Sequence, residues 1–386
     1  MSAAMGDDDG AVVVSCRAPI NMAVLKYWGK RDERLVLPLH ASLSLTLHVD
    51  CMASSITVAP GPDLAGDEML LNGTPCDLDG NARLQAVLQA CRRLSTKSES
   101  FTRQPIRLEC RNDFPTAAGL ASSASGLACL TSALMTFYSC RESFPGEATT
   151  IARQGSGSAC RSMFGGFVTW EKGSDDATGH DSVARQFVDE SHWSDLRVVI
   201  LVVSSGEKEV GSTMGMRRSV ETSELLAYRA GHVVEPRMQA FKSAIKQKDF
   251  GEFAELVMRD SNQFHAVCAD TYPPVFYLND VSHAIIDAVH AFNHDRIRAA
   301  YTFDAGPNAC LFTREQDLPD LLSSMVEAFA PDDAGDRPTF VRDPLRLCPD
   351  LSSVRPRATR RHRHRVRQII VTKGGPGPQI STKVVP

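Results

Sequence analysis

The chain has 386 residues, 43% hydrophobic and 23% charged, which is typical of a folded, soluble protein long enough for two domains. Its longest aliphatic run, residues 198–203, is far shorter than the roughly 20 residues of a membrane-spanning helix, and the acidic residues 6–10 do not resemble a secretory signal. Eleven scattered cysteines fit reduced thiols better than disulfides or a zinc finger. We therefore expect a cytoplasmic protein, with a peroxisome-like organelle or a mitochondrion as alternatives.

The formal net charge of −4 conceals an uneven distribution. Residues 355–367 contain seven arginines and no acid, so the rest of the chain carries 35 basic and 46 acidic residues, a net charge of −11. An anionic ligand must therefore be bound by a local site. The arginine-rich segment could bind nucleic acid, but no aromatic residues are interleaved with its arginines, and we favour a solvated connection.

The first 110 residues predict mainly strands. A β-branched run covers residues 11–17, apolar and polar residues alternate over residues 43–50 as in a half-buried strand, and a third strand is predicted at residues 106–110. Between them, residues 81–94 predict a helix with one apolar face.

A loop of small residues, 115–123, leads into a helix with an apolar stripe. Small residues let the backbone approach a ligand, and the free N–H groups of a helix start favour phosphate. Ser122 and Ser123 lie in the first turn, where they could contact phosphate or a metal. The alternative is a serine-capped helix after a flexible loop. The segment is not a Walker A loop, because no Gly-Lys-Ser/Thr follows the glycine.

A second loop of small residues, 155–161, combines two glycines, two serines and Arg161. It could form an anion-binding nest in which Arg161 pairs with a carboxylate or phosphate. The alternative is a surface turn that happens to contain an arginine.

The second half begins with a buried strand at residues 196–204 and then becomes mainly helical. Helices are predicted at residues 236–247, 249–268 and 280–294. A strand at 299–303 is followed by a turn and by a partner strand that ends at residue 313. A long connection is predicted at 331–367 and a last strand at 367–372. Early strands followed by helices indicate an α+β protein.

Two further segments could carry chemistry. Asp304 ends a strand and starts a tight turn, where it could be a general base, an orienting acceptor, or only an acceptor for the turn's own N–H groups. Residues 21–32 concentrate basic and aromatic side chains, and Lys26 and Tyr27 could bind a diphosphate. The alternative for this segment is a partly exposed aromatic turn.

Together these segments resemble the mevalonate diphosphate decarboxylase family, within the superfamily of galactokinase, homoserine kinase, mevalonate kinase and phosphomevalonate kinase. The resemblance covers most of the chain and rests on residues 18–21, 26–32, 114–123, 155–162, 260–265 and 303–308. It implies a two-domain α+β kinase-like fold with the active site in the interdomain cleft. We place a nucleotide-binding domain at residues 1–190 and a second domain at 191–386, in which a strand at 367–380 could return to the first domain.

The resemblance also implies a reaction. ATP phosphorylates the 3-hydroxyl of (R)-5-diphosphomevalonate, and loss of phosphate and carbon dioxide then gives isopentenyl diphosphate, in the mevalonate pathway of isoprenoid and sterol biosynthesis. The implied cofactors are ATP and Mg²⁺, the latter with unknown ligands. We expect a homodimer, and neither nucleic acid nor a membrane as partner.

The implied roles fall into three groups. Asp304 would orient or deprotonate the 3-hydroxyl, Arg161 would hold the substrate carboxylate, Asn21 would help fix Arg161, and Ser123 would lie beside the transferred phosphate. The residues expected to hold the substrate are Lys26, Tyr27, Trp28, Arg83, Ser156, Gly157, Ser158 and Arg161. Those expected to hold ATP are Ala117, Ala118, Gly119, Leu120, Ala121, Ser122, Ser123 and Ser212.

Two other functions stay open at this point. A kinase of the same superfamily would phosphorylate a mevalonate-type hydroxyl and stop, giving ADP without carbon dioxide. A nucleic-acid-binding protein would use the arginine-rich segment, which differs from the neutral linker usual in the family, but would leave both small-residue loops and Asp304 unexplained.

Overall fold

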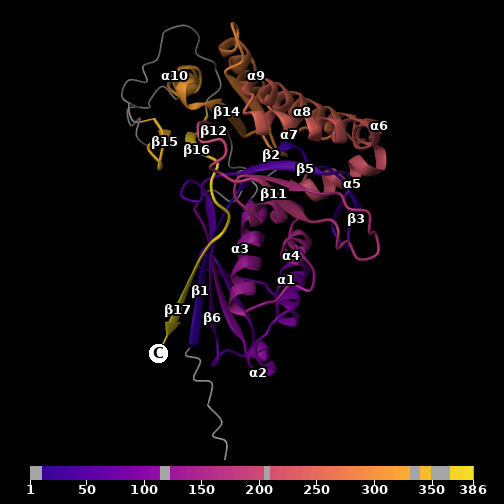
Figure 1. The fold of residues 1–386 in the computed structure, drawn as a ribbon, viewed down its shortest axis with the longest axis vertical. Coiled ribbons are helices and arrows are strands. Elements are labelled where there is room, and N and C mark those ends of the chain that lie inside the picture. The colour runs from indigo at the N-terminus through magenta and orange to yellow at the C-terminus, as the bar shows by residue number, and fades with distance from the viewer. Residues whose placement is uncertain (1–10, 114–121, 204–208, 331–339, 349–365, 386) are drawn as a thin grey trace, which may run out of the picture.

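Three sheets with six, four and five strands, a two-stranded ribbon and the helices packed on them make up the described part of the chain. The computed structural model describes residues 11–113, 122–203, 209–330, 340–348 and 366–385. In Figure 1 the six-stranded sheet occupies the lower half of the molecule, and the long helices of the second half lie at the top. The arginine-rich segment expected at residues 355–367 lies mostly outside the described residues.

The first sheet has the strand order β17-β1-β6-β9-β7-β8 and is covered by α1, α3 and α4 (Figure 1). Its strands are β1 Ala11–Pro19, β6 Ala53–Pro60, β7 Glu68–Leu71, β8 Thr74–Cys76, β9 Ile106–Asn112 and β17 Gln379–Val385. The helices are α1 Ala82–Arg93, α2 Glu99–Arg103, α3 Ser122–Phe137 and α4 Glu147–Gly155. Asn81 caps α1 by accepting hydrogen bonds from the backbone N–H groups of Arg83 and Leu84, which confirms the helix predicted at residues 81–94.

The second sheet, with the order β11-β10-β5-β2, lies between the other two. Its strands are β2 Asn21–Leu25, β5 Ser42–Thr46, β10 Phe167–Trp170 and β11 Ala184–Val188, and the ribbon beside it is β3 Lys30–Asp32 with β4 Leu37–Pro38. The half-buried strand predicted at residues 43–50 is wrong in two respects. β5 is shorter, and all five of its residues are buried, because β2 and β10 flank it and its polar face meets a buried guanidinium.

The third sheet has the order β13-β14-β12-β16-β15 and carries the helices of the second half. Its strands are β12 Leu196–Val202, β13 Ala299–Phe303, β14 Ala309–Arg314, β15 Val341–Arg342 and β16 Gln368–Lys373. The helices are α5 Ser212–Thr222, α6 Glu224–Tyr228, the π-helical turn Arg229–Val233, α7 Val234–Gln247, α8 Phe250–Asp270, α9 Asp280–Phe292 and α10 Leu318–Phe329. The prediction of the strand at 299–303 is confirmed to the residue.

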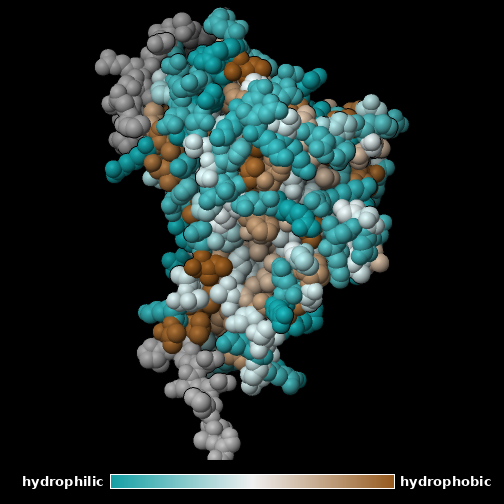
Figure 2. Space-filling view, in the orientation of Figure 1, coloured by the Kyte–Doolittle hydropathy of each residue, from teal (hydrophilic) through white to brown (hydrophobic). Residues whose placement is uncertain are grey.

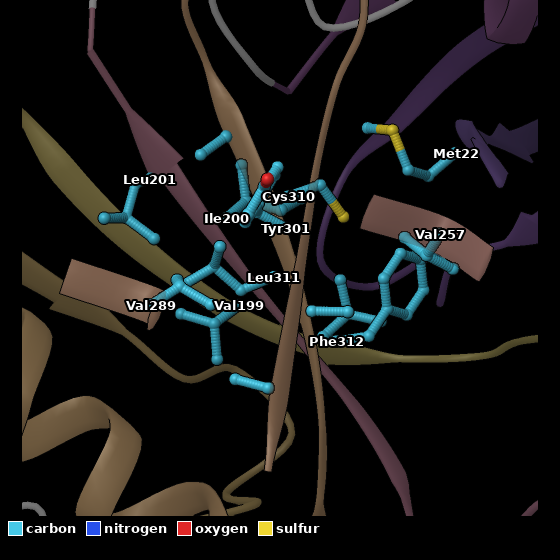
Figure 3. Packing of buried hydrophobic residues seen from close by; sticks show 14 of the residues in the cluster. Met22, Val199, Ile200, Leu201, Val257, Val289, Tyr301, Cys310, Leu311 and Phe312 are labelled. Atoms are coloured by element: carbon cyan, nitrogen blue, oxygen red, sulfur yellow. The ribbon is translucent and has the colours of Figure 1, made fainter. Parts of the chain in front are cut away.

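One hydrophobic core joins the second and third sheets, and a separate core lies under the first sheet. Figure 3 shows Met22 of β2 beside Val257 of α8 and Phe312 of β14. The middle sheet therefore packs on elements from the far half of the chain. The division of the chain at residue 190, between β11 and β12, stays a prediction.

The predictions for residues 155–161, 331–367 and 367–380 need correction. Residues 155–161 are not a loop, since α4 ends at Gly155 and a 3₁₀-helix covers Gly157–Met163. The connection predicted at 331–367 contains β15, which pairs in parallel with β16. The segment 367–380 is divided: β16 stays in the third sheet, and the strand that pairs with β1 is β17.

Neither the surface nor the cysteines identify the cellular compartment of the protein. No helix in the described ranges is both long enough and apolar enough to cross a bilayer. All eleven cysteines are free thiols. In Figure 2 hydrophilic residues dominate the face over α8 and α9, and apolar groups lie along the first sheet, where Ile380 and Val384 of β17 are exposed.

Candidate active site

A cleft of about 970 Å³ opens where β2, α1, α4 and the start of α5 approach the turn after β13. It brings together twelve residues predicted for the site: Asn21, Lys26, Tyr27, Trp28, Arg83, Ser123, Ser156, Gly157, Ser158, Arg161, Ser212 and Asp304. The predicted ATP-binding residues Ala117, Ala118, Gly119, Leu120 and Ala121 lie outside the described residues, and Ser122 begins α3.

Arg161 is a buried guanidinium at one wall of this cleft. It is only 2% exposed, and it donates from Nε to Ser44 Oγ at 3.0 Å and from Nη1 to Ser42 Oγ at 2.7 Å. No carboxylate of the described residues forms an ion pair with it. Burial lowers the pKa of Arg161, and the charges of Cys160 and Asp304 oppose this shift. A buried cation held by neutral groups is suited to an anionic ligand.

Asn21 links Arg161 to the 3₁₀-helix. Its Oδ1 accepts from Arg161 Nε at 3.3 Å, while its Nδ2 donates to the Ser158 carbonyl oxygen at 3.0 Å and to Ser162 Oγ at 2.8 Å. Asn21, at the start of β2, thus fixes both the guanidinium and the backbone of the predicted anion loop.

Lys26 and Asp304 form an ion pair across the cleft. Lys26 Nζ donates to Asp304 Oδ1 at 2.6 Å, although the two residues are 278 positions apart in the sequence. The Lys26 side chain is 3% exposed and that of Asp304 is 28% exposed, so the carboxylate is the partner that solvent or a ligand can reach. This pairing was not predicted, because Lys26 was expected to hold a diphosphate.

His265 of α8 lies close to this pair. Burial and, to a lesser extent, the charge of Lys26 lower the pKa of its imidazole to about 3. The ring is therefore neutral, and its Nε2 is buried without a hydrogen-bond partner among the described residues. Asp304 is thus flanked by one cation and one neutral ring.

Tyr27 and Trp28 form the apolar part of the wall. Tyr27 packs on Trp170 with ring centroids 4.6 Å apart, its hydroxyl has no partner in the described part of the chain, and burial raises its pKa well above the ordinary value. Trp28 is 3% exposed and donates its only polar hydrogen to Ser219 Oγ. Trp28 can therefore offer a ligand an apolar surface but no hydrogen bond.

The two segments of small residues meet at the start of α3. Ser123 Oγ lies 3.2 Å from Ser156 Oγ, so hydroxyls from both segments face one space. A Cβ at Gly157 would lie 2.8 Å from the Tyr27 hydroxyl oxygen, which explains why this position is a glycine. Close backbone approach beside a helix N-terminus suits phosphate binding.

Several cleft residues were missed in the sequence. Thr213 Oγ1 lies 3.5 Å from Nη2 of the predicted residue Arg83, and Lys30 pairs with Glu33 at 2.5 Å. Ser44, which binds Arg161, was expected only on the polar side of a half-buried strand, and Ser42, which also binds Arg161, lies just before the predicted strand. The periodicity shows that the two serines share a face but not what that face meets.

The cleft's oxygen donors suit a hard cation bound together with phosphates. Among the residues described there is no group of three or more His, Cys, Asp or Glu side chains placed to hold a metal. Mg²⁺ commonly binds through one or two protein oxygens, water and substrate phosphates, and does not need such a cage. Ser123 and Asp304 are among the cleft residues that could supply such oxygens.

Comparison with known proteins agrees with this arrangement. Residues 18–184 match the diphosphomevalonate decarboxylase-like N-terminal domain, and residues 198–381 match the mevalonate 5-diphosphate decarboxylase C-terminal domain. A diphosphomevalonate decarboxylase of Homo sapiens is 47% identical over 391 residues, covering 97% of this chain and 95% of that protein.

Two solved structures extend the similarity. A mevalonate diphosphate decarboxylase from Trypanosoma brucei is 36% identical, with a TM-score of 0.86 over 96% of this chain and 98% of that one. A structure of MDDEF in complex with MVAPP, AMPPCP and magnesium is 29% identical, with a TM-score of 0.77 over 97% of this chain and 100% of that one.

The α+β fold and its cleft define the class, an enzyme with the kinase-like fold of the galactokinase and mevalonate kinase superfamily. Within that class, the chain belongs to the diphosphomevalonate decarboxylase family.

Proposed function

We propose that this protein converts ATP and (R)-5-diphosphomevalonate to isopentenyl diphosphate, ADP, phosphate and carbon dioxide. Family membership over almost the whole chain supports this activity. The observation that carries it is the presence in one cleft of the Lys26–Asp304 pair and of Arg161, a buried cation without a described carboxylate partner. The first suits activation of a hydroxyl, and the second suits a substrate carboxylate.

Asp304 is the proposed acceptor for the hydrogen of the substrate's 3-hydroxyl. With Oδ1 bound to Lys26 Nζ, its other carboxylate oxygen can orient or accept this proton while the hydroxyl oxygen attacks the γ-phosphorus of ATP. Lys26 keeps the carboxylate in place and balances its charge.

Phosphoryl transfer depends mainly on positioning and on stabilising charge. Ser123, in the first turn of α3, would bond an oxygen of the transferred phosphoryl group, and Ser156 lies close enough to support it. Mg²⁺, when bound, would neutralise charge on the ATP phosphates, and Ser123 and Asp304 are the residues proposed to hold it. Residues 117–121 and Ser212 are proposed to contact the nucleotide.

Decarboxylation then follows from the geometry at Arg161. The new phosphate leaves the tertiary carbon with its bonding electron pair, and the electron pair between the carboxylate carbon and the adjacent methylene forms the C=C bond as carbon dioxide departs. A tight ion pair would hold electrons on the carboxylate. We therefore assign Arg161 to orienting the carboxylate, with Asn21, Ser42 and Ser44 fixing the guanidinium.

The substrate diphosphate is proposed to lie between the 3₁₀-helix and the opening of the cleft. Ser156, Gly157 and Ser158 would approach it with backbone and hydroxyl groups, with Tyr27 and Arg83 at its sides. Since Lys26 already pairs with Asp304, its contact with the diphosphate would be secondary to that pairing.

The test is a parallel measurement of ADP and carbon dioxide from ATP and diphosphomevalonate. We expect equal amounts of both, and no carbon dioxide without ATP. ADP without carbon dioxide would instead identify a kinase that stops after phosphorylation. The homodimer and the cytoplasmic location stay predictions, which gel filtration with light scattering and cell fractionation can check.

A further inference from the structure

Helix α8 carries a polar segment, residues 260–265, to which the mechanism above assigns no role. Asp260 and Ser261 are 0% and 1% exposed, and both side chains bond to backbone N–H groups outside the helix. Such contacts place an α8 side chain next to each half of the Lys26–Asp304 pair.

The first contact holds Lys26. Asp260 Oδ2 accepts from the Lys26 backbone N–H at 2.7 Å, and Arg229 Nη2 donates to the Lys26 carbonyl oxygen at 3.3 Å. Arg229 also binds both oxygens of Asp260, and Arg237 Nη1 donates to Asp260 Oδ1 at 2.7 Å. The carboxylate is therefore fixed by two guanidinium groups while it binds the backbone of Lys26.

The second contact holds Asp304. Ser261 Oγ accepts from the Phe303 backbone N–H at 3.1 Å, one residue before Asp304. His265, one turn further along α8, also lies close to the Phe303 backbone. The C-terminal end of β13 is thus bound to the helix at the point where Asp304 leaves the strand.

Sheet topology explains why these contacts matter. In the described part of the chain, β2 and β13 are outermost strands of two different sheets, so the outward backbone groups at their ends lack a strand partner. The α8 side chains satisfy those groups and connect the two strand ends. The 2.6 Å ion pair then depends on one rigid helix and not on two separate loops.

We propose that α8 sets the spacing of Lys26 and Asp304, with Asp260 and Ser261 as positioning residues. Its effect on turnover rests on the proposed function. A misplacement of about 1 Å at such a site can cost on the order of 10²-fold in rate. The helix would act on kcat, because neither side chain lines the cleft.

The test uses three variants of the full-length protein. Ser261→Ala removes the acceptor for Phe303, Ser261→Thr keeps an oxygen there, and Thr302→Val removes a neighbouring buried hydroxyl that has no hydrogen-bond partner among the described residues. We expect Ser261→Ala to lower kcat by about 10- to 100-fold with little change in KM for either substrate. Ser261→Thr should restore most of the loss, and Thr302→Val should match wild type.

Backbone hydrogen exchange gives a readout independent of the reaction. In Ser261→Ala, exchange should become faster in residues 299–304 but not in β14. A kcat within twofold of wild type, an equal loss in Thr302→Val, or unchanged exchange at Phe303 would overturn the proposal. If the wild type released no carbon dioxide but exchange rose as expected, the assigned reaction would be wrong while the positioning by α8 would stand.

Discussion

At the scale of single residues, the cleft holds a buried guanidinium with neutral groups and a carboxylate with a cation. Arg161 is bound by Ser42, Ser44 and the oxygen of Asn21, and Asp304 is bound by Lys26. Two substitutions separate the contributions of Arg161 and Asp304.

Asp304→Asn should abolish most turnover, because the amide cannot accept the hydroxyl proton as the carboxylate does. We expect kcat to fall by about 10²- to 10⁴-fold while ATP still binds, measured by carbon dioxide release and by calorimetric titration with ATP. Asp317→Asn is the control, since Asp317 is a buried carboxylate bound to Arg296 outside the cleft. Nearly normal carbon dioxide release by the Asp304 variant would remove this residue from the mechanism.

Arg161→Gln should lower kcat/KM for diphosphomevalonate by at least about 10²-fold, because the carboxylate loses the buried guanidinium proposed to orient it. Steady-state kinetics at saturating ATP measure this effect. Arg197→Gln provides the comparison, since Arg197 is a buried arginine of β12 that pairs with Glu315 away from the cleft. Equal losses in both variants would indicate damage to the fold and not to the site.

Most residues of this site could be predicted from the sequence, but the contacts between their side chains could not. The residues of the two small-residue segments and Asp304 stand out because their types suit phosphate and proton chemistry. The Lys26–Asp304 pair could not be predicted, because no local sequence pattern connects two residues that are 278 positions apart. Ser44 was assigned to a solvated face, because alternation alone cannot distinguish water from a buried guanidinium.

At the scale of helices and strands, periodicity was sufficient for α1 and β13 but failed around residues 155–161. Gly155 and Gly157 suggested a flexible loop, yet they are small because neighbours approach them. A Cβ at Gly155 would lie 2.5 Å from Leu127 Cδ1 and 3.0 Å from Val87 Cγ2. The glycine lets α4 pack closely on α3 and α1.

Because of this packing, we expect alanine to change the free energy of unfolding in opposite directions at two glycines. Gly155→Ala should destabilise the protein by about 1–3 kcal/mol, because the added methyl overpacks the contact with Leu127. Gly126→Ala, inside α3 with Ser54 Oγ at 3.9 Å as its nearest contact, should stabilise it by about 0.5–1 kcal/mol. Denaturant unfolding of both variants measures the difference. Equal stabilisation by both would show that the α3–α4 contact can relax.

At the scale of the whole molecule, buried neutral histidines should limit stability in acid. Burial and, to a lesser extent, the charge of Arg229 lower the pKa of His40 to about 4. The unfolded chain takes up this proton as pH falls through about 6.5, whereas the folded protein resists it until about pH 4. Stability is therefore lost as pH falls through this window.

At about pH 5 the loss due to His40 alone should be on the order of 2 kcal/mol relative to neutral pH. Urea unfolding at about pH 7.5 and pH 5 measures it, and His40→Phe should show a smaller loss between the two conditions. His294→Gln is the matched control, because the His294 side chain is 73% exposed. If His40→Phe lost as much stability as wild type, other groups would cause the acid sensitivity.

The pairing of β1 with β17 has a consequence for biosynthesis. Ala11 lies opposite Val385, so one side of β1 has no strand partner until residues 379–385 have been made. At roughly 5–20 residues per second, that interval is on the order of tens of seconds. During that time β1 exposes unsatisfied backbone groups to other nascent chains. We therefore expect the first sheet to stay incomplete until β17 has been made, and a chain that stops before residue 379 to depend on chaperones.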